Sequence, residues 1–258
     1  CDRNRQVHVV PQLIASTPDE FRWIVRLFQE NGYREADINL GCPFPMQVRA
    51  HRGSGLLRYK EEAEYLLRTI EEFPDISFSV KMRLGWECAD ESFVLLSLLN
   101  KLPLKHITLH PRLGIQQYKG AIDWDGFSRF YEECKLPLYY NGDLVGLEDI
   151  RGIKERFPGL AGLMLGRGLL ASPWLATEFV SGQVLTVNER RDKLVMFHES
   201  LMDEYAARLE GGEHQVLSKM KTIWDYLLPE ADKRLRKKVL KSTSLTSYQS
   251  AVKDLLSL

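Results

Sequence analysis

Six short apolar runs, rich in β-branched residues, recur along the first part of the chain, and a helical pattern follows most of them. The runs cover residues 7–15, 36–40, 78–84, 106–110, 136–141 and 160–165. Strands of a parallel sheet that helices cover are expected to be nearly continuous in apolar residues. The repetition therefore predicts an α/β fold with a parallel sheet, either doubly wound or closed as a (β/α)₈ barrel.

The ends of these runs favour the barrel. Polar or reactive residues follow run after run, and in a barrel the carboxyl ends of all strands surround one site. These residues include Gln12, Asn39, Lys81, His110 and Asn141, and Arg167 in the segment Gly166-Arg167-Gly168. Six strands are visible where a barrel needs eight. We therefore expect a TIM-type (β/α)₈ barrel that is N-terminally incomplete, with two strands missing before residue 7.

The strand signals stop after about residue 182, and the rest of the sequence predicts helices only. They are expected at 189–209, 214–228, 230–241 and 244–256. This divides the chain into a (β/α) domain at 1–182 and a helical domain at 183–258. From residue 230 to the end, seven Lys and Arg stand against three Asp and Glu, a net charge of +4. This is either a phosphate-facing surface or a solvated helix face.

The first helix has a clear start signal. Thr17, Pro18 and Glu20 match an N-cap residue, a proline at the first helical position and the glutamate of a capping box. We therefore expect the side chains of Thr17 and Glu20 to cap each other's backbone N–H groups.

Composition limits the class of protein. The 35 Lys and Arg balance 35 Asp and Glu, so any RNA-binding surface must be local. No apolar run approaches the roughly 20 residues of a membrane-spanning helix, and the first residues lack the apolar core of a signal peptide. The four cysteines stand far apart. We expect a cytoplasmic protein without a metal site, a disulfide framework or a membrane anchor.

Three features suggest chemistry, and each has a plainer reading. Lys81 and His110 end adjacent strands and could bind the electron-rich edge of a flavin, although a lone histidine is more often structural. Arg167, between two glycines after the last strand, could bind a phosphate or lie on the surface of a tight turn. Cys42 could act as an acid or a nucleophile, or could simply be packed.

Eight ordered blocks make the chain resemble the tRNA-dihydrouridine synthases between about Val9 and Trp174. The blocks are DINLGCP at 37–43, GSGLL at 53–57, VKMRLG at 80–85, HPR at 110–112, YKG at 118–120, DW at 123–124, NGD at 141–143 and GRG at 166–168. The resemblance implies an FMN-dependent oxidoreductase that reduces the 5,6 double bond of uridine in tRNA and whose FMN is re-reduced by NADPH. It also implies a monomer whose helical domain binds tRNA.

The resemblance also implies residue roles. Hydride would pass from reduced FMN to C6 of the uracil, and Cys42 would protonate C5, a task that suits a thiol because it is mostly protonated at neutral pH. Asn39, Arg83 and Tyr118 would hold the uracil. The flavin set would be Gln12, Lys81, His110, Asn141, Gly142, Asp143, Gly166 and Arg167.

The chain departs from the family pattern at its start. The Ala-Pro-Met segment of the usual first strand and the Thr-Glu pair of the second are absent from the sequence. We therefore expect a truncated chain with exposed sheet edges, whose own activity is open. Two alternatives stay open: another FMN-dependent barrel oxidoreductase, or a tRNA-binding protein that has lost catalysis.

Overall fold

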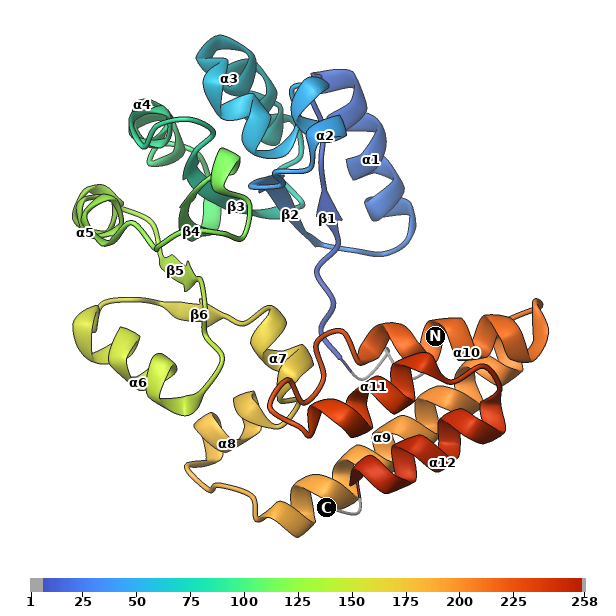
Figure 1. Cartoon of the computed structure of the whole chain (residues 1–258). Coiled ribbons are helices and arrows are strands. Elements are labelled where there is room, and N and C mark those ends of the chain that lie inside the picture. Colours follow the sequence, from blue (N-terminus) through green and yellow to red (C-terminus); the bar gives the residue numbers. More distant parts are fainter. Residues whose placement is uncertain (1–6, 257–258) are drawn as a thin grey trace. The chain divides into compact units, whose positions relative to one another are not determined.

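The computed structural model describes residues 7–256 (Figure 1). Its strands, between Gln12 and Met164, form one parallel sheet. Its six strands lie in sequential order, so each pairs with its neighbours along the chain. They are β1 (Gln12–Leu13), β2 (Glu35–Leu40), β3 (Ser77–Gly85), β4 (Leu104–Leu113), β5 (Leu138–Asn141) and β6 (Gly162–Met164). The sequential parallel order with intervening helices confirms the predicted (β/α) topology.

Helices and short 3₁₀ turns connect the strands. They are α1 (Pro18–Glu30), α2 (Pro45–Arg49), η2 (Gly53–Arg58), α3 (Lys60–Arg68), η3 (Thr69–Glu72), α4 (Asp90–Leu99), η4 (Gly114–Gln116), α5 (Trp124–Glu133) and α6 (Leu147–Arg156). After β6 follow α7 (Arg167–Ala171) and α8 (Leu175–Ser181). Helix α4 follows one of the strands after which the sequence shows no clear helical pattern. Its segment is apolar on most sides, so it lacks the one-sided periodicity from which a helix is read.

The strand boundaries differ most at β1. The predicted strand at 7–15 shortens to two residues, whereas β4 extends beyond the predicted 106–110 on both sides. The apolar face of the sheet packs on helices through aromatic rings: Phe21 of α1 lies 5.6 Å from Phe78 of β3, and Phe127 of α5 meets Tyr140 of β5 edge-on at 5.0 Å. All four rings are buried, and each burial stabilises the fold by roughly 2 kcal/mol.

The start of α1 corrects one expectation. The Thr17 hydroxyl accepts from the Glu20 N–H at 3.3 Å, so Thr17 is the N-cap residue as predicted. The capping box is wrong, because the Glu20 carboxylate accepts from the Ser16 N–H at 3.0 Å and pairs with Arg52. Because the Glu20 carboxylate pairs with Arg52, which is distant in sequence, it does not accept a hydrogen bond from the Thr17 N–H.

The described chain divides into two compact units. The first runs up to Gly142 and includes Phe157–Met164, and the second contains Asp143–Arg156 and everything from Leu165 onward. The predicted boundary at residue 182 therefore falls inside the second unit, just after α8. Four further helices follow there: α9 (Val187–Arg208), α10 (Gly212–Ile223), α11 (Lys233–Lys241) and α12 (Leu245–Leu256).

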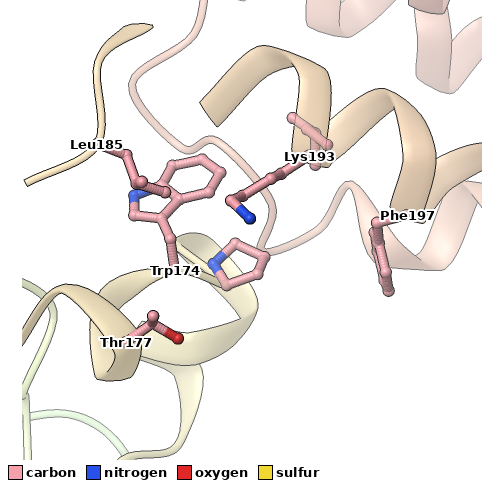
Figure 2. Close-up of a pocket in the computed structure, with 7 residues that line it drawn as sticks. Trp174, Thr177, Leu185, Lys193 and Phe197 are labelled. Carbon is pink, nitrogen blue, oxygen red and sulfur yellow. The ribbon is translucent and has the colours of Figure 1, made fainter. Parts of the chain in front are cut away.

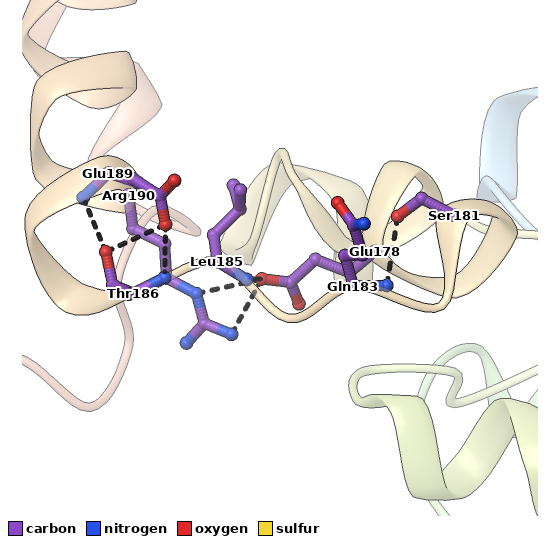
Figure 3. Close-up of polar contacts among 7 residues, drawn as sticks. All are labelled: Glu178, Ser181, Gln183, Leu185, Thr186, Glu189 and Arg190. Carbon is purple, nitrogen blue, oxygen red and sulfur yellow. Dashed lines mark hydrogen bonds and ion pairs between the residues drawn. The ribbon is translucent and has the colours of Figure 1, made fainter.

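The linker between α8 and α9 is held by a buried carboxylate (Figure 3). Glu178, whose side chain is 2% exposed, accepts from the Leu185 N–H at 2.9 Å and from Nε and Nη2 of Arg190 at 3.0 and 2.8 Å. The Arg190 guanidinium also lies over the Trp174 ring at 5.4 Å. Thr186 and Glu189 then form a capping box at the start of α9. The turn between the two helices is thus tied at several points.

A pocket of about 210 Å³ lies beside this linker (Figure 2). Trp174, Leu185 and Phe197 form much of its apolar wall, and the Lys193 and Thr177 side chains add polar atoms. Among residues 7–256, no helix combines the length and the apolar composition that a membrane crossing requires.

The core of α9–α12 contains a polar network. Trp224 Nε1 donates to Tyr248 Oη at 2.8 Å, and the same oxygen lies 2.8 Å from His198 Nε2. His198 is 5% exposed, and this burial lowers its pKa to about 4. The imidazole is therefore neutral in the folded protein at neutral and mildly acidic pH.

His198 should make the fold acid-sensitive. The unfolded chain takes up a proton near pH 6.5, whereas the folded chain does so only near its pKa of about 4. The unfolded state thus binds more protons in this window, and the free energy of unfolding should fall by about 2 kcal/mol between about pH 7 and about pH 4.5. Urea unfolding at both pH values measures the change. The His198→Gln variant should lack this component, and an equal pH dependence in both proteins would contradict the assignment.

Candidate active site

One face of the sheet is polar. Residues that pair across parallel strands face the same side, and the pairs Asn39 with Lys81 and Arg83 with His110 place these four on one face. The same register adds further members. The polar face consists of Gln12, Asp37, Asn39, Ser79, Lys81, Arg83, Thr108, His110 and Asn141. The structure thus brings together the predicted residues of β1 to β5.

Cys42 lies in a rigid loop at the carboxyl end of β2. The Asn39 side-chain oxygen accepts from the N–H groups of Gly41 and Cys42 at 3.0 and 2.9 Å. The Cys42 carbonyl accepts from the N–H and the hydroxyl of Ser54 at 3.1 and 3.0 Å. Gly53 has a φ of +58°, and a Cβ there would lie 2.7 Å from the Cys42 carbonyl oxygen. The loop is therefore clamped on both sides of a half-buried free thiol.

Asp37 was not among the predicted site residues. It is 8% exposed, and its carboxylate accepts from Gln12 Nε2 and from the Ser79 hydroxyl, both at 2.7 Å. Burial raises the pKa of Asp37, although the two hydrogen bonds and nearby cations act in the opposite direction. A carboxylate in the middle of an apolar strand was the signal that could have identified it.

The cations at the strand ends have different environments. Burial is the main cause that lowers the pKa of Lys81, and the adjacent Arg83 lowers it further. Within the described chain, no carboxylate lies within 4.0 Å of the Lys81 ammonium. Arg83 is 2% exposed and donates from Nη1 to the Leu113 carbonyl at 2.8 Å. The site therefore carries positive charge that suits an anionic or electron-rich partner.

Two of the predicted substrate-binding residues meet. The Arg83 guanidinium lies over the Tyr118 ring at 5.4 Å, and Tyr118 is 58% exposed. Asn39, the third, directs its oxygen toward the Cys42 loop and its amide nitrogen toward Gln12. Its amide oxygen is therefore occupied by the N–H groups of the loop. Only an N–H of its side-chain amide can donate to a substrate.

Arg112 is a second residue that the sequence reasoning did not assign. It is 4% exposed and donates from Nε and Nη2 to the Gly120 carbonyl at 3.1 and 2.8 Å. Its Nη1 lies 3.3 Å from His110 Nε2. Arg112 thus fastens the loop that carries Tyr118 to the strand that carries His110. Its position in the block HPR was the available signal.

The remaining predicted residues lie at the ends of β5 and β6. Asn141 donates to the Met164 carbonyl at 2.8 Å, and Gly142 follows it at the end of the first unit. Asp143 and Arg167 belong to the second unit, where their side chains lie 3.4 Å apart. Gly166 precedes α7 and has open space at its Cβ position. Gly168 has a packing role, because a Cβ there would overlap the Leu144 carbonyl oxygen.

Residues 7–256 contain no cluster of three or more His, Cys, Asp or Glu side chains that could hold a metal ion. The geometry instead combines a thiol, amides, a hydroxyphenyl ring and cations. The model of the dihydrouridine synthase family matches residues 1–256. The chain belongs to the dihydrouridine synthase family.

Curated members of the family are similar over much of the chain. A probable tRNA-dihydrouridine synthase of Rickettsia prowazekii is 26% identical over 202 residues, which cover 75% of this chain and 62% of that protein. The tRNA-dihydrouridine synthase B of Klebsiella pneumoniae is 28% identical over 183 residues, covering 68% and 57%. The chain thus spans less than two thirds of the length of these relatives. A solved structure of morphinone reductase in complex with tetrahydroNAD aligns with a TM-score of 0.44 at 14% identity, over 66% of this chain and 49% of that one.

Proposed function

We propose that this protein reduces uridine in tRNA to 5,6-dihydrouridine in the cytoplasm, with FMN as its cofactor and NADPH as the reductant. The observation that carries the proposal is the clamped Cys42 loop beside the cationic polar face. Membership of the dihydrouridine synthase family supports it. The other residues of that face then supply cofactor and substrate contacts.

The residues on the polar face fit a flavin. Lys81 is a desolvated cation without a carboxylate within 4.0 Å in the described chain, so an electron-rich partner would stabilise it. Gln12 and His110 add hydrogen-bonding groups to the same face. We infer that these three residues hold the isoalloxazine ring. When bound, FMN would supply the hydride for C6 of the uracil.

Cys42 provides the proton in this proposal. A proton donor must be held on the side of the base where the new C–H bond forms, and the bonds from Asn39 and Ser54 fix the loop that carries the thiol. Arg83 and Tyr118 hold the uracil, with the guanidinium fixed by the Leu113 carbonyl and lying over the Tyr118 ring. The target base has to leave the RNA stack to reach them.

The helix α11 is our candidate for contacts with the tRNA backbone. Lys233, Lys237 and Lys241 are exposed and recur at intervals of four residues, so they share one face of the helix. Two other cations of this region are engaged within the protein, since Lys238 pairs with Asp254 at 2.6 Å and Arg236 donates to the Trp224 carbonyl. A stripe of exposed lysines suits a phosphate backbone.

Replacing Arg167 should weaken FMN binding. We assign its guanidinium to the FMN phosphate because it follows the sixth strand, where a barrel places its phosphate site. In the Arg167→Ala variant, the flavin retained after gel filtration should fall at least about tenfold, the loss expected for one charge-assisted hydrogen bond. Arg151→Ala, which removes a surface cation paired with Glu148, is the matched control. Equal flavin content in the original protein, Arg167→Ala and Arg151→Ala would mean that Arg167 is a surface residue that does not bind FMN.

The visible spectrum of the purified chain, with and without added FMN, tests the proposal first. Flavin absorbance followed by conversion of uridine to dihydrouridine in unmodified tRNA with NADPH is the expected result. Flavin without this conversion would favour another FMN-dependent oxidoreductase. Binding of tRNA without flavin would favour a non-catalytic RNA-binding protein.

A further inference from the structure

A continuous chain of hydrogen bonds connects a buried carboxylate to the backbone of the Cys42 loop. The Asp37 carboxylate accepts from Gln12 Nε2 at 2.7 Å, Gln12 Oε1 accepts from Asn39 Nδ2 at 2.7 Å, and Asn39 Oδ1 accepts from the Cys42 N–H at 2.9 Å. Asp37, Gln12 and Asn39 lie on neighbouring strands of one sheet face. The carboxylate is thus coupled to the thiol loop through two side-chain amides.

The groups at both ends of this series of hydrogen bonds determine how the two side-chain amides are oriented. Backbone N–H groups can only donate, so the Asn39 oxygen must face Gly41 and Cys42, and its nitrogen must face Gln12. The Gln12 oxygen therefore faces Asn39, and its nitrogen faces Asp37. An ionised carboxylate only accepts, so it satisfies this last donor without a conflict.

The fixed direction has a consequence at the site surface. Each amide nitrogen carries two N–H bonds, and in the described chain each has one acceptor, which leaves one further N–H on Gln12 and one on Asn39. Both amides therefore present a donor, which suits the carbonyl oxygens of a pyrimidine or a flavin. A reversed amide would present an acceptor in its place.

We propose that Asp37 is a positioning residue for the Cys42 loop and acts through Gln12 and Asn39. Its role in catalysis rests on the function proposed above. Its role in holding the loop does not, because it concerns hydrogen bonds within this chain alone. Asp37 has no contact with substrate in this proposal.

Amide hydrogen exchange of the 258-residue chain, followed by NMR at mildly alkaline pH, tests the loop directly. In Asp37→Ala, exchange of the Gly41 and Cys42 N–H groups should accelerate about tenfold, as expected when one hydrogen bond is weakened. Alkylation of Cys42 should accelerate with it, while that of exposed Cys88 should not. Unchanged exchange at Gly41 and Cys42 in a folded variant would overturn the proposal.

Swapping the amide of residue 12 and the carboxylate of residue 37 distinguishes a positioning role from general destabilisation. Gln12→Glu places a second carboxylate against Asp37 and should also accelerate exchange at Gly41 and Cys42. Adding Asp37→Asn supplies an amide donor to the new carboxylate, which can still accept from Asn39, so exchange should return to within about twofold of the original. These variants are nearly isosteric, so they remain informative if Asp37→Ala fails to fold. Failure of the second substitution to restore slow exchange would overturn the coupling.

The two proposals fail separately. If the unmodified chain binds no flavin and reduces no uridine, the proposed function is contradicted, whereas the exchange pattern still tests the loop. If uridine is reduced but the paired substitutions show no coupling, only the role of Asp37 is lost.

Discussion

Replacing Cys42 by alanine is expected to reduce the rate of uridine reduction by about 10² to 10⁴-fold, the usual contribution of a positioned proton donor. The same variant should retain FMN and oxidise NADPH, because the substitution leaves Lys81, His110 and Gln12 in place. Single-turnover reaction of reduced enzyme with unmodified tRNA measures the first rate, and NADPH oxidation measures the second.

The other cysteines provide the control for this experiment. Cys88 is exposed, and Cys88→Ala should leave both rates unchanged. Uridine reduction at the original rate in Cys42→Ala would remove the acid assignment. Loss of flavin together with uridine reduction would instead show that the substitution had damaged the loop or the cofactor site.

Glu178→Ala should have the largest effect on stability. It removes the acceptor of the Leu185 N–H and of two Arg190 donors, and leaves them without a partner in the turn between α8 and α9. Breaking a buried ion pair costs about 3 to 5 kcal/mol, and the lower end applies here because Arg190 is 34% exposed and can be rehydrated. Denaturant unfolding should therefore show a loss of about 3 kcal/mol in the free energy of unfolding.

A capping residue next to this turn offers a comparison. Glu189→Ala removes the exposed half of the capping box at α9 and should cost about 1 kcal/mol. The test is the ratio of the losses in the free energy of unfolding of the two variants, because both residues act at the start of the same helix. Equal losses would mean that the buried position of Glu178 contributes nothing beyond an ordinary surface contact.

Much of the sheet could be predicted because strand ends carry a local signal. The carboxyl ends of parallel strands meet at one edge, so Asn39, Lys81 and His110 could be placed on one site from their positions alone. The resemblance implied that Arg83 and Tyr118 both hold the uracil, but it did not predict the contact between their side chains. The structure shows the contact and the loop that supports it.

Other features depend on contacts between distant residues. The capping box at α1 failed because Arg52 takes part of the Glu20 carboxylate, and no local pattern reveals that competitor. Helix α4 was missed because its apolar residues surround the helix and obscure the period. Asp37 belongs to the sequence block at 37–43, but the block does not indicate a role for its carboxylate. The hydrogen bonds from Gln12 and Ser79 show that Asp37 begins the series of hydrogen bonds to the Cys42 loop.

The sequential order of the strands also bears on how the chain folds. Each strand from β2 to β6 pairs with the strand made just before it, so every step in building the sheet closes a short stretch of chain. Contacts of short sequence separation cost little loop entropy and allow rapid folding. A nascent chain can therefore add one strand and its helix at a time as it leaves the ribosome, with the growing edge always awaiting the next segment to be synthesised.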